Sequence, residues 1–131
     1  MARILVADDH ADTREVLGVI LAGAGHELLF AGNAREALSR YREASPDLAL
    51  IDIFMPGKDG VQVIVEIRRE FPSAKLIAIS AGWAPSVPGA SGHRPHDVLS
   101  DAAKGGADAT LAKPVEYETL VSVVNRVLGG V

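Results

Sequence analysis

Five polar side chains stand at the ends of short apolar segments, and their types suggest chemistry with phosphate and a metal ion. In chain order they are Asp8, Asp9, Asp52, Ser80 and Lys113. Carboxylates in one crevice repel each other, and a hard divalent cation such as Mg2+ relieves that repulsion. Lysine adds a second positive charge, and serine adds a hydroxyl that can donate to an oxygen. This combination predicts phosphoryl transfer, in which catalysis is mostly positioning and electrostatic stabilisation.

Asp52 is the side chain that we expect to be phosphorylated, because a carboxylate can act as a nucleophile and form an aspartyl phosphate. It ends an apolar run in the stretch Leu48–Gly60, where Met55-Pro56-Gly57 break regular structure and Asp59-Gly60 can begin a helix. The other expected roles are metal binding for Asp8 and Asp9, and contact with phosphoryl oxygens for Lys113 and Ser80.

The elements that must position these side chains follow from hydrophobic patterning. Continuous apolar runs, typical of strands covered on both faces, are Arg3–Ala7, Leu28–Ala31, Leu48–Ile51, Leu76–Ile79 and Ala109–Ala112. Segments with helical spacing alternate with them, so the sequence predicts an α/β fold with a parallel sheet between helices. Ligands of such sheets lie at the carboxyl ends of the strands, where the five polar side chains would meet.

The expected helices begin near Asp12, Asn33, Asp59, His96 and Tyr117. Asp12 and Asn33 are each followed by a glutamate three residues later, which is the spacing of a capping box. Val16 is expected on the packed face of the first helix, and the fourth is expected to span His96–Ala103.

Composition narrows the class of protein further. The 131 residues are 48% hydrophobic, enough for one compact domain over residues 1–131, with no output domain expected. No segment approaches the roughly 20 apolar residues of a membrane span. The absence of cysteine favours a reducing cytoplasm. A net charge of -4 and the lack of a basic run argue against direct binding of nucleic acid.

An ordered set of motifs makes the chain resemble a known family. The set comprises Asp8-Asp9, Asp52 with Met55-Pro56-Gly57 and Asp59-Gly60, Ser80-Ala81, and Gly106-Ala107-Asp108 before Lys113-Pro114. Over essentially its whole length the chain resembles the receiver domain of two-component response regulators, like the chemotaxis regulators. The resemblance implies a flavodoxin-like, three-layer fold with strand order 2-1-3-4-5.

The resemblance also implies a function as a switch. Asp52 would accept a phosphoryl group from a phosphohistidine on a sensor histidine kinase or a histidine phosphotransfer protein. Mg2+ would be bound by Asp9, Asp52 and the backbone carbonyl of Phe54, with Asp8 acting mainly through metal-bound water. Such a domain is not a turnover enzyme, since it catalyses only its own phosphorylation and dephosphorylation. It would signal through a downstream protein target, and a second copy of the chain is a further candidate partner.

Two departures from the family concern the surface expected to change on phosphorylation. That surface is expected around Ala103–Thr110 and Val115–Val124. Tyr117 on the last helix is expected to be half-buried in the core or to contact a partner. Thr110 stands where the family usually has an aromatic switch residue. The spacing from Ser80 to Lys113 is also longer than usual. The extra length lies in Gly82–Pro95, where Trp83 is expected to cover the site or serve the partner surface.

Other interpretations stay open at the level of sequence. One is a protein-interaction module that keeps the fold but works without phosphorylation, which the Thr110 departure favours. Another is a Mg2+-dependent phosphohydrolase. Those enzymes usually carry a second acid two residues after the nucleophile, where this chain has Phe54. His10 is expected to start a helix, and His93 and His96 to be surface residues, rather than to bind metal.

Overall fold

The structure is a computed structural model that describes residues 2–53, 60–81, 106–113 and 115–129. The expectations for Phe54, Met55-Pro56-Gly57, Asp59, Trp83, His93 and the His96–Ala103 helix concern residues outside these ranges.

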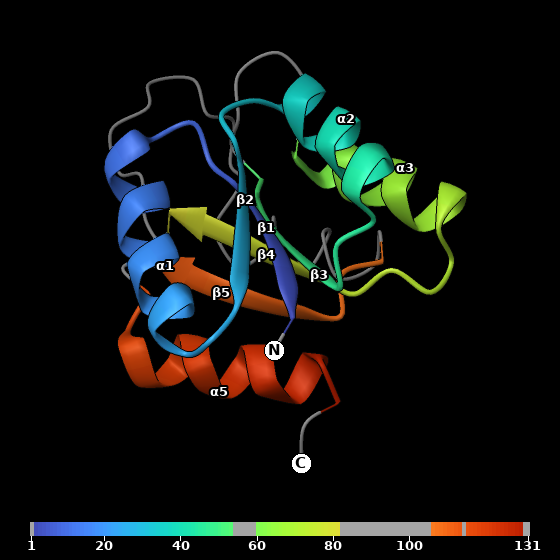
Figure 1. Ribbon diagram of the computed structural model, residues 1–131. Coiled ribbons are helices and arrows are strands. Elements are labelled where there is room, and N and C mark those ends of the chain that lie inside the picture. The colour runs from blue at the N-terminus through green and yellow to red at the C-terminus, as the bar shows by residue number, and fades with distance from the viewer. Residues whose placement is uncertain (1, 54–59, 82–105, 114, 130–131) are drawn as a thin grey trace, which may run out of the picture.

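Parallel strands form one five-stranded sheet in the order β2-β1-β3-β4-β5, which confirms the expected topology (Figure 1). The strands are β1 (Arg3–Ala7), β2 (Glu27–Ala31), β3 (Leu48–Asp52), β4 (Leu76–Ala81) and β5 (Ala109–Lys113). Four of them extend one or two residues past the expected apolar runs. At the site the strand pairing continues into the polar residues, with Asp52 opposite Ile79 and Lys113 opposite Ala81. Apolar patterning alone does not register this continuation.

The described helices cover both faces of the sheet, which gives the expected three layers (Figure 1). They are α1 (Ala11–Gly23), α2 (Ala34–Ala44), α3 (Gly60–Glu70) and α5 (Tyr117–Val127). Alternation along β1 shows how each face gets its core: Ile4 and Val6 pack with α1 and α5, whereas Leu5 and Ala7 pack with α2 and α3. No helix among these residues combines the length and the apolar character that crossing a membrane requires.

The cap predicted for α2 is confirmed. The Asn33 side chain accepts a hydrogen bond of 2.9 Å from the backbone N–H of Glu36. The Glu36 carboxylate in turn accepts one of 2.8 Å from the backbone N–H of Gly32. Local side chains therefore satisfy two backbone donors at this helix start, as a capping box does.

The capping box predicted at Asp12 is wrong, although the helix does begin within one residue of Asp12. The helix begins at Ala11, so Asp12 already lies inside its first turn, and His10 occupies the N-cap position without a side-chain capping bond. The apolar pattern also predicts the wrong position for Val16, which was expected on the packed face but is 56% exposed, while Leu17 and Leu21 are buried. The face of α1 that meets the sheet is set by the position of β2, which helical spacing does not reveal.

Arg68 on α3 ties together the amino ends of β4 and β5. Its guanidinium donates to the backbone carbonyls of Pro72, Ala74 and Gly106 and to the carboxylate of Asp108. The same Asp108 oxygen accepts a hydrogen bond of 2.8 Å from the backbone N–H of Leu76, the first residue of β4. The half-buried Arg68 guanidinium thus fixes the amino ends of β4 and β5, at the end of the sheet opposite to the predicted site.

Gly60 brings the start of α3 against the end of β3. Its backbone N–H donates a hydrogen bond of 3.1 Å to the carbonyl of Ile53. A Cβ atom at Gly60 would lie 2.3 Å from the Cα of Ile53 and 2.4 Å from the carbonyl oxygen of Asp52. Both neighbours are backbone atoms and cannot rotate away, so only glycine permits this approach.

Gly60→Ala should therefore destabilise the protein strongly, by about 2 kcal/mol or more, because the backbone around Asp52 must shift. Gly23→Ala is the matched control, since a Cβ at this exposed last residue of α1 meets nothing within 4 Å. That control should be neutral or stabilising by up to about 1 kcal/mol. Urea unfolding of both variants measures the difference, and equal midpoints would contradict the steric argument.

Candidate functional site

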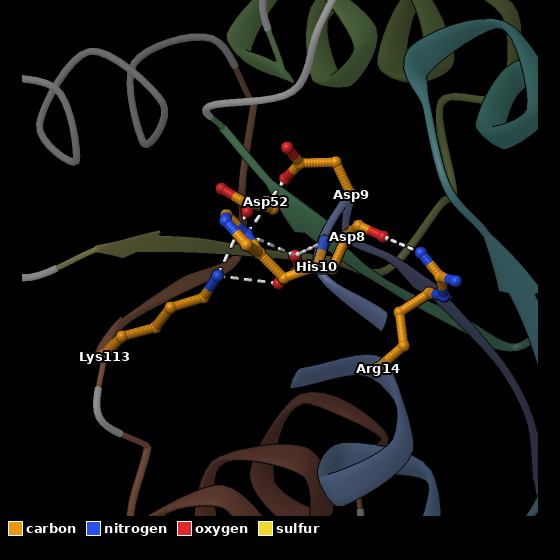
Figure 2. Close-up of polar contacts among 6 residues, drawn as sticks. All are labelled: Asp8, Asp9, His10, Arg14, Asp52 and Lys113. Atoms are coloured by element: carbon orange, nitrogen blue, oxygen red, sulfur yellow. Dashed lines mark hydrogen bonds and ion pairs between the residues drawn. The ribbon is translucent and has the colours of Figure 1, made fainter. Parts of the chain in front are cut away.

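The carboxyl ends of three strands bring two aspartates and a lysine into contact (Figure 2). Asp8 follows β1, Asp52 ends β3 and Lys113 ends β5. The Lys113 Nζ atom lies 2.7 Å from Asp8 Oδ2 and 3.1 Å from Asp52 Oδ2. Both aspartates are almost fully buried, at 1% and 2% exposure. Buried like charges are costly, and the shared ammonium offsets their repulsion.

The charge state of Lys113 depends on these two carboxylates. Burial by itself lowers the pKa of Lys113, but the hydrogen bonds that its ammonium donates to Asp8 and Asp52, together with the negative charge of Asp52, outweigh it and raise this pKa above its usual value. Lys113 is therefore cationic over the whole neutral range. A fixed positive charge at this point can stabilise negative charge that develops on a transferred group.

Asp9 and His10 complete the acidic cluster on its more exposed side. The imidazole Nδ1 of His10 lies 3.2 Å from Asp9 Oδ1 and 3.4 Å from Asp8 Oδ1 (Figure 2). His10 does stand at the start of a helix, as expected. The contact of its ring with both carboxylates was missed, although its place directly after the acidic pair was the available signal.

The backbone of Asp8 is held on both sides. Its N–H donates a hydrogen bond of 3.0 Å to the carbonyl of Ala31 on β2. Its own carbonyl accepts a hydrogen bond of 2.6 Å from Nη1 of Arg14 (Figure 2). Its carboxylate Oδ1 also accepts 2.8 Å from the backbone N–H of His10. Arg14 was not singled out in the sequence, because a lone arginine in the first turns of a helix resembles any solvated residue.

Ser80 is buried beside this cluster but does not join its hydrogen bonds. It follows Ile79, the residue of β4 that pairs with Asp52. Ser80 is 0% exposed, and its hydroxyl has no hydrogen-bond partner among the described residues. A buried, unpaired hydroxyl is unfavourable unless something else satisfies it, and a bound ligand can do so.

The residues predicted for a partner surface are accessible where the structure describes them. Thr110 on β5 is exposed. Tyr117, the first residue of α5, is 60% exposed and so lies farther from the core than expected. Ala103 and Trp83 lie outside the described residues.

The donor set suits a divalent cation. One ligand atom each from Asp8, Asp9, His10 and Asp52 lies within 4.8 Å of the others. The three carboxylates supply the oxygen ligands that Mg2+ prefers, and Mg2+ commonly binds one or two carboxylates together with waters and a phosphate. The residues present therefore fit such an ion, with Phe54 outside the described ranges.

Comparisons with known proteins agree on one family. The model of the response regulator receiver domain matches residues 4–125. The chain is 34% identical to the chemotaxis protein CheY of Thermotoga maritima, over 95% of this chain and 96% of that protein. It is 32% identical to protein PilH of Pseudomonas aeruginosa, over 99% and 100% of the two chains. A CheY-like receiver domain from Methanospirillum hungatei has a TM-score of 0.83 at 27% identity, covering 98% of this chain and 94% of that one.

Replacing Lys113 by methionine should lower the free energy of unfolding by about 3 kcal/mol at pH 7, because Asp8 and Asp52 lose the ammonium that faces both. The matched control is Lys75→Met, which removes a partly buried lysine that donates 3.0 Å to the carbonyl of Leu128. That control should cost about 1 kcal/mol. Urea unfolding with a chelator present measures both, and equal losses would contradict the role given to Lys113.

The stability that Lys113 contributes should also depend on pH in one direction. Its pKa is higher in the folded protein than in the unfolded chain. The contribution is therefore complete below the unfolded value of about 10.4 and is lost as the pH rises through the folded pKa. The difference between wild type and Lys113→Met should be constant from about pH 8 to 10 and shrink above that. A difference that grows with pH would contradict this sign.

Proposed function

Because this chain belongs to the family of response regulator receiver domains, we propose that it accepts a phosphoryl group on Asp52 and signals through altered protein contacts. The observation that carries the proposal is the ammonium of Lys113 between the buried carboxylates of Asp8 and Asp52. This geometry puts a nucleophile and a fixed positive charge at one point. Phosphoryl transfer needs both.

The proposed reaction moves the phosphoryl group from a phosphohistidine of a sensor kinase or a phosphotransfer protein. A carboxylate oxygen of Asp52 forms the new bond to phosphorus. The bond from phosphorus to the donor imidazole breaks, and its electron pair returns to that ring. Lys113 donates to one phosphoryl oxygen and the hydroxyl of Ser80 to another, which gives that buried hydroxyl the partner that it lacks among the described residues. Water later attacks the phosphorus, the bond from phosphorus to the Asp52 oxygen breaks, and inorganic phosphate leaves, which restores the Asp52 carboxylate.

Asp9 and Asp52 are the residues proposed to hold Mg2+, with Asp8 beside them. Bound there, Mg2+ would neutralise charge on the phosphoryl group. Arg14 holds the backbone carbonyl of Asp8, and the backbone N–H of His10 donates to its carboxylate, so Asp8 can orient a water without moving.

A change at Lys113 has a direct route to the surface. Lys113 ends β5, which also carries the exposed Thr110, and α5 begins shortly after it with the exposed Tyr117. When Lys113 turns to a phosphoryl oxygen, its contact with Asp8 must change, and the end of β5 moves with it. We therefore place the partner surface on β5 and α5. A cytoplasmic location, as the sequence predicts, fits partners of this kind.

A second candidate function rests on Thr110. An exposed threonine replaces the aromatic residue through which the family is expected to couple the site to its surface. Without that coupling, the same surface can bind a partner whether or not Asp52 is phosphorylated. Equal partner affinity for wild type and Asp52→Asn would favour this interaction module.

The first test is incubation with Mg2+ and acetyl phosphate or phosphoramidate, followed by intact mass measurement. The wild type should gain one phosphoryl group in the presence of Mg2+ and none with a chelator. Asp52→Asn should gain none, because the nucleophile is gone.

Asp12→Asn is the matched control, since Asp12 is an exposed acid in the first turn of α1. It should be phosphorylated as fully as the wild type. Phosphorylation that persists in Asp52→Asn would contradict the assignment of the acceptor, and the absence of any gain from both donors would favour the interaction module.

A further inference from the structure

His10 offers the acidic cluster a ligand of a different kind from its carboxylates. At the N-cap position its side chain makes no capping bond. Its Nδ1 instead lies 3.2 Å from Asp9 Oδ1 and 3.4 Å from Asp8 Oδ1 (Figure 2). The side chain is 68% exposed, so no packing against the core holds it there. The two carboxylates within ion-pair distance of its Nδ1 are also the expected metal ligands.

The distances allow one cation to reach all four side chains. Ligand atoms of Asp8, Asp9, His10 and Asp52 lie within 4.8 Å of one another. A first-row metal at about 2.0–2.2 Å from each ligand spans at most about 4.4 Å between opposite ligands. The set must therefore contract by only a few tenths of an ångström. The exposed His10 and the partly exposed Asp9 can move by that much.

The chemistry of the fourth ligand separates classes of metal. Mg2+ takes oxygen ligands and gains little from an imidazole nitrogen. Zn2+, Ni2+ and Co2+ accept imidazole readily, so the same nitrogen adds to their affinity. A site of three carboxylates alone follows the general affinity order of the metals, and His10 should widen the gap between these ions and Mg2+.

We infer that His10 is a metal ligand that raises the preference of this chain's cation site for first-row transition-metal ions such as Zn2+ and Co2+ over Mg2+, with Nδ1 completing the set Asp8, Asp9 and Asp52. The inference rests on the cation site of the proposed function and deepens it, because the ion held beside Asp52 then depends on which metals are available. It concerns selectivity between cations and does not depend on whether Asp52 is phosphorylated.

The test compares Zn2+ and Mg2+ affinities of the full chain by calorimetry. His10→Ala should lower the ratio of Zn2+ to Mg2+ affinity by about tenfold or more, a loss of the size seen even for outer-shell partners of metal ligands. His26→Asn is the matched control, because the His26 Nδ1 accepts a hydrogen bond from the backbone of Ala2 and the Asn carbonyl can replace that acceptor. The control should leave the ratio unchanged.

A second readout identifies the coordinating atom directly. In long-range 1H–15N spectra, Zn2+ should shift the Nδ1 resonance of His10, whereas saturating Mg2+ should leave it near its metal-free position. An unchanged affinity ratio in His10→Ala would overturn the inference, and so would a gain in affinity for both ions. The latter would mean that the imidazole serves only as an internal counter-ion. Phosphorylation of the wild type with Mg2+ is scored separately, so its failure would refute the proposed function and not the metal preference.

Discussion

The burial of two carboxylates at one edge of the sheet is the constraint on which the site depends. Asp8 directly follows β1 and Asp52 ends the neighbouring strand β3, and the two are 1% and 2% exposed. Such a pair is tolerable only with a compensating positive charge. Lys113 supplies it from β5, which joins the sheet beyond β4. The charge balance of the site is therefore complete only when β5 has joined the sheet.

The amino ends and the carboxyl ends of the strands differ in how fully their polar groups are hydrogen-bonded. At the amino ends of β4 and β5, Arg68 satisfies backbone carbonyls and Asp108, and Asp108 also binds the start of β4. Those bonds leave little freedom where the strands begin. At the carboxyl ends, a lysine is shared between two acids and a serine hydroxyl has no protein partner among the described residues. A switch needs this combination, because the strand ends can respond to new charge while their starts stay in place.

Backbone contacts fix the positions of the residues at the carboxyl ends of the strands. Arg14 grips the carbonyl of Asp8, and Gly60 allows α3 to start directly against Ile53. Neither Arg14 nor Gly60 takes part in the proposed chemistry, yet each fixes the position of a residue beside or within the site. Small misplacements of reacting groups are costly in transfer reactions. His10 adds an exposed nitrogen to this set of oxygens.

The sequence by itself determined the order of the elements, the Asn33 cap and the strand ends that carry Asp8, Asp52 and Lys113. Those features follow from continuous apolar runs and from capping contacts within a few residues, and both are local in the chain. The resemblance to the receiver family supplied the strand order. Tertiary structure alone decided which face of α1 packs, so that Val16 is exposed, and it brought the His10 ring close to the acidic pair. It also decided the clearance at Gly60 and the bonds of Arg68 to Gly106. These depend on where distant segments come to lie against each other, and hydrophobic periodicity, which reports only the environment along one element, contains no record of that placement.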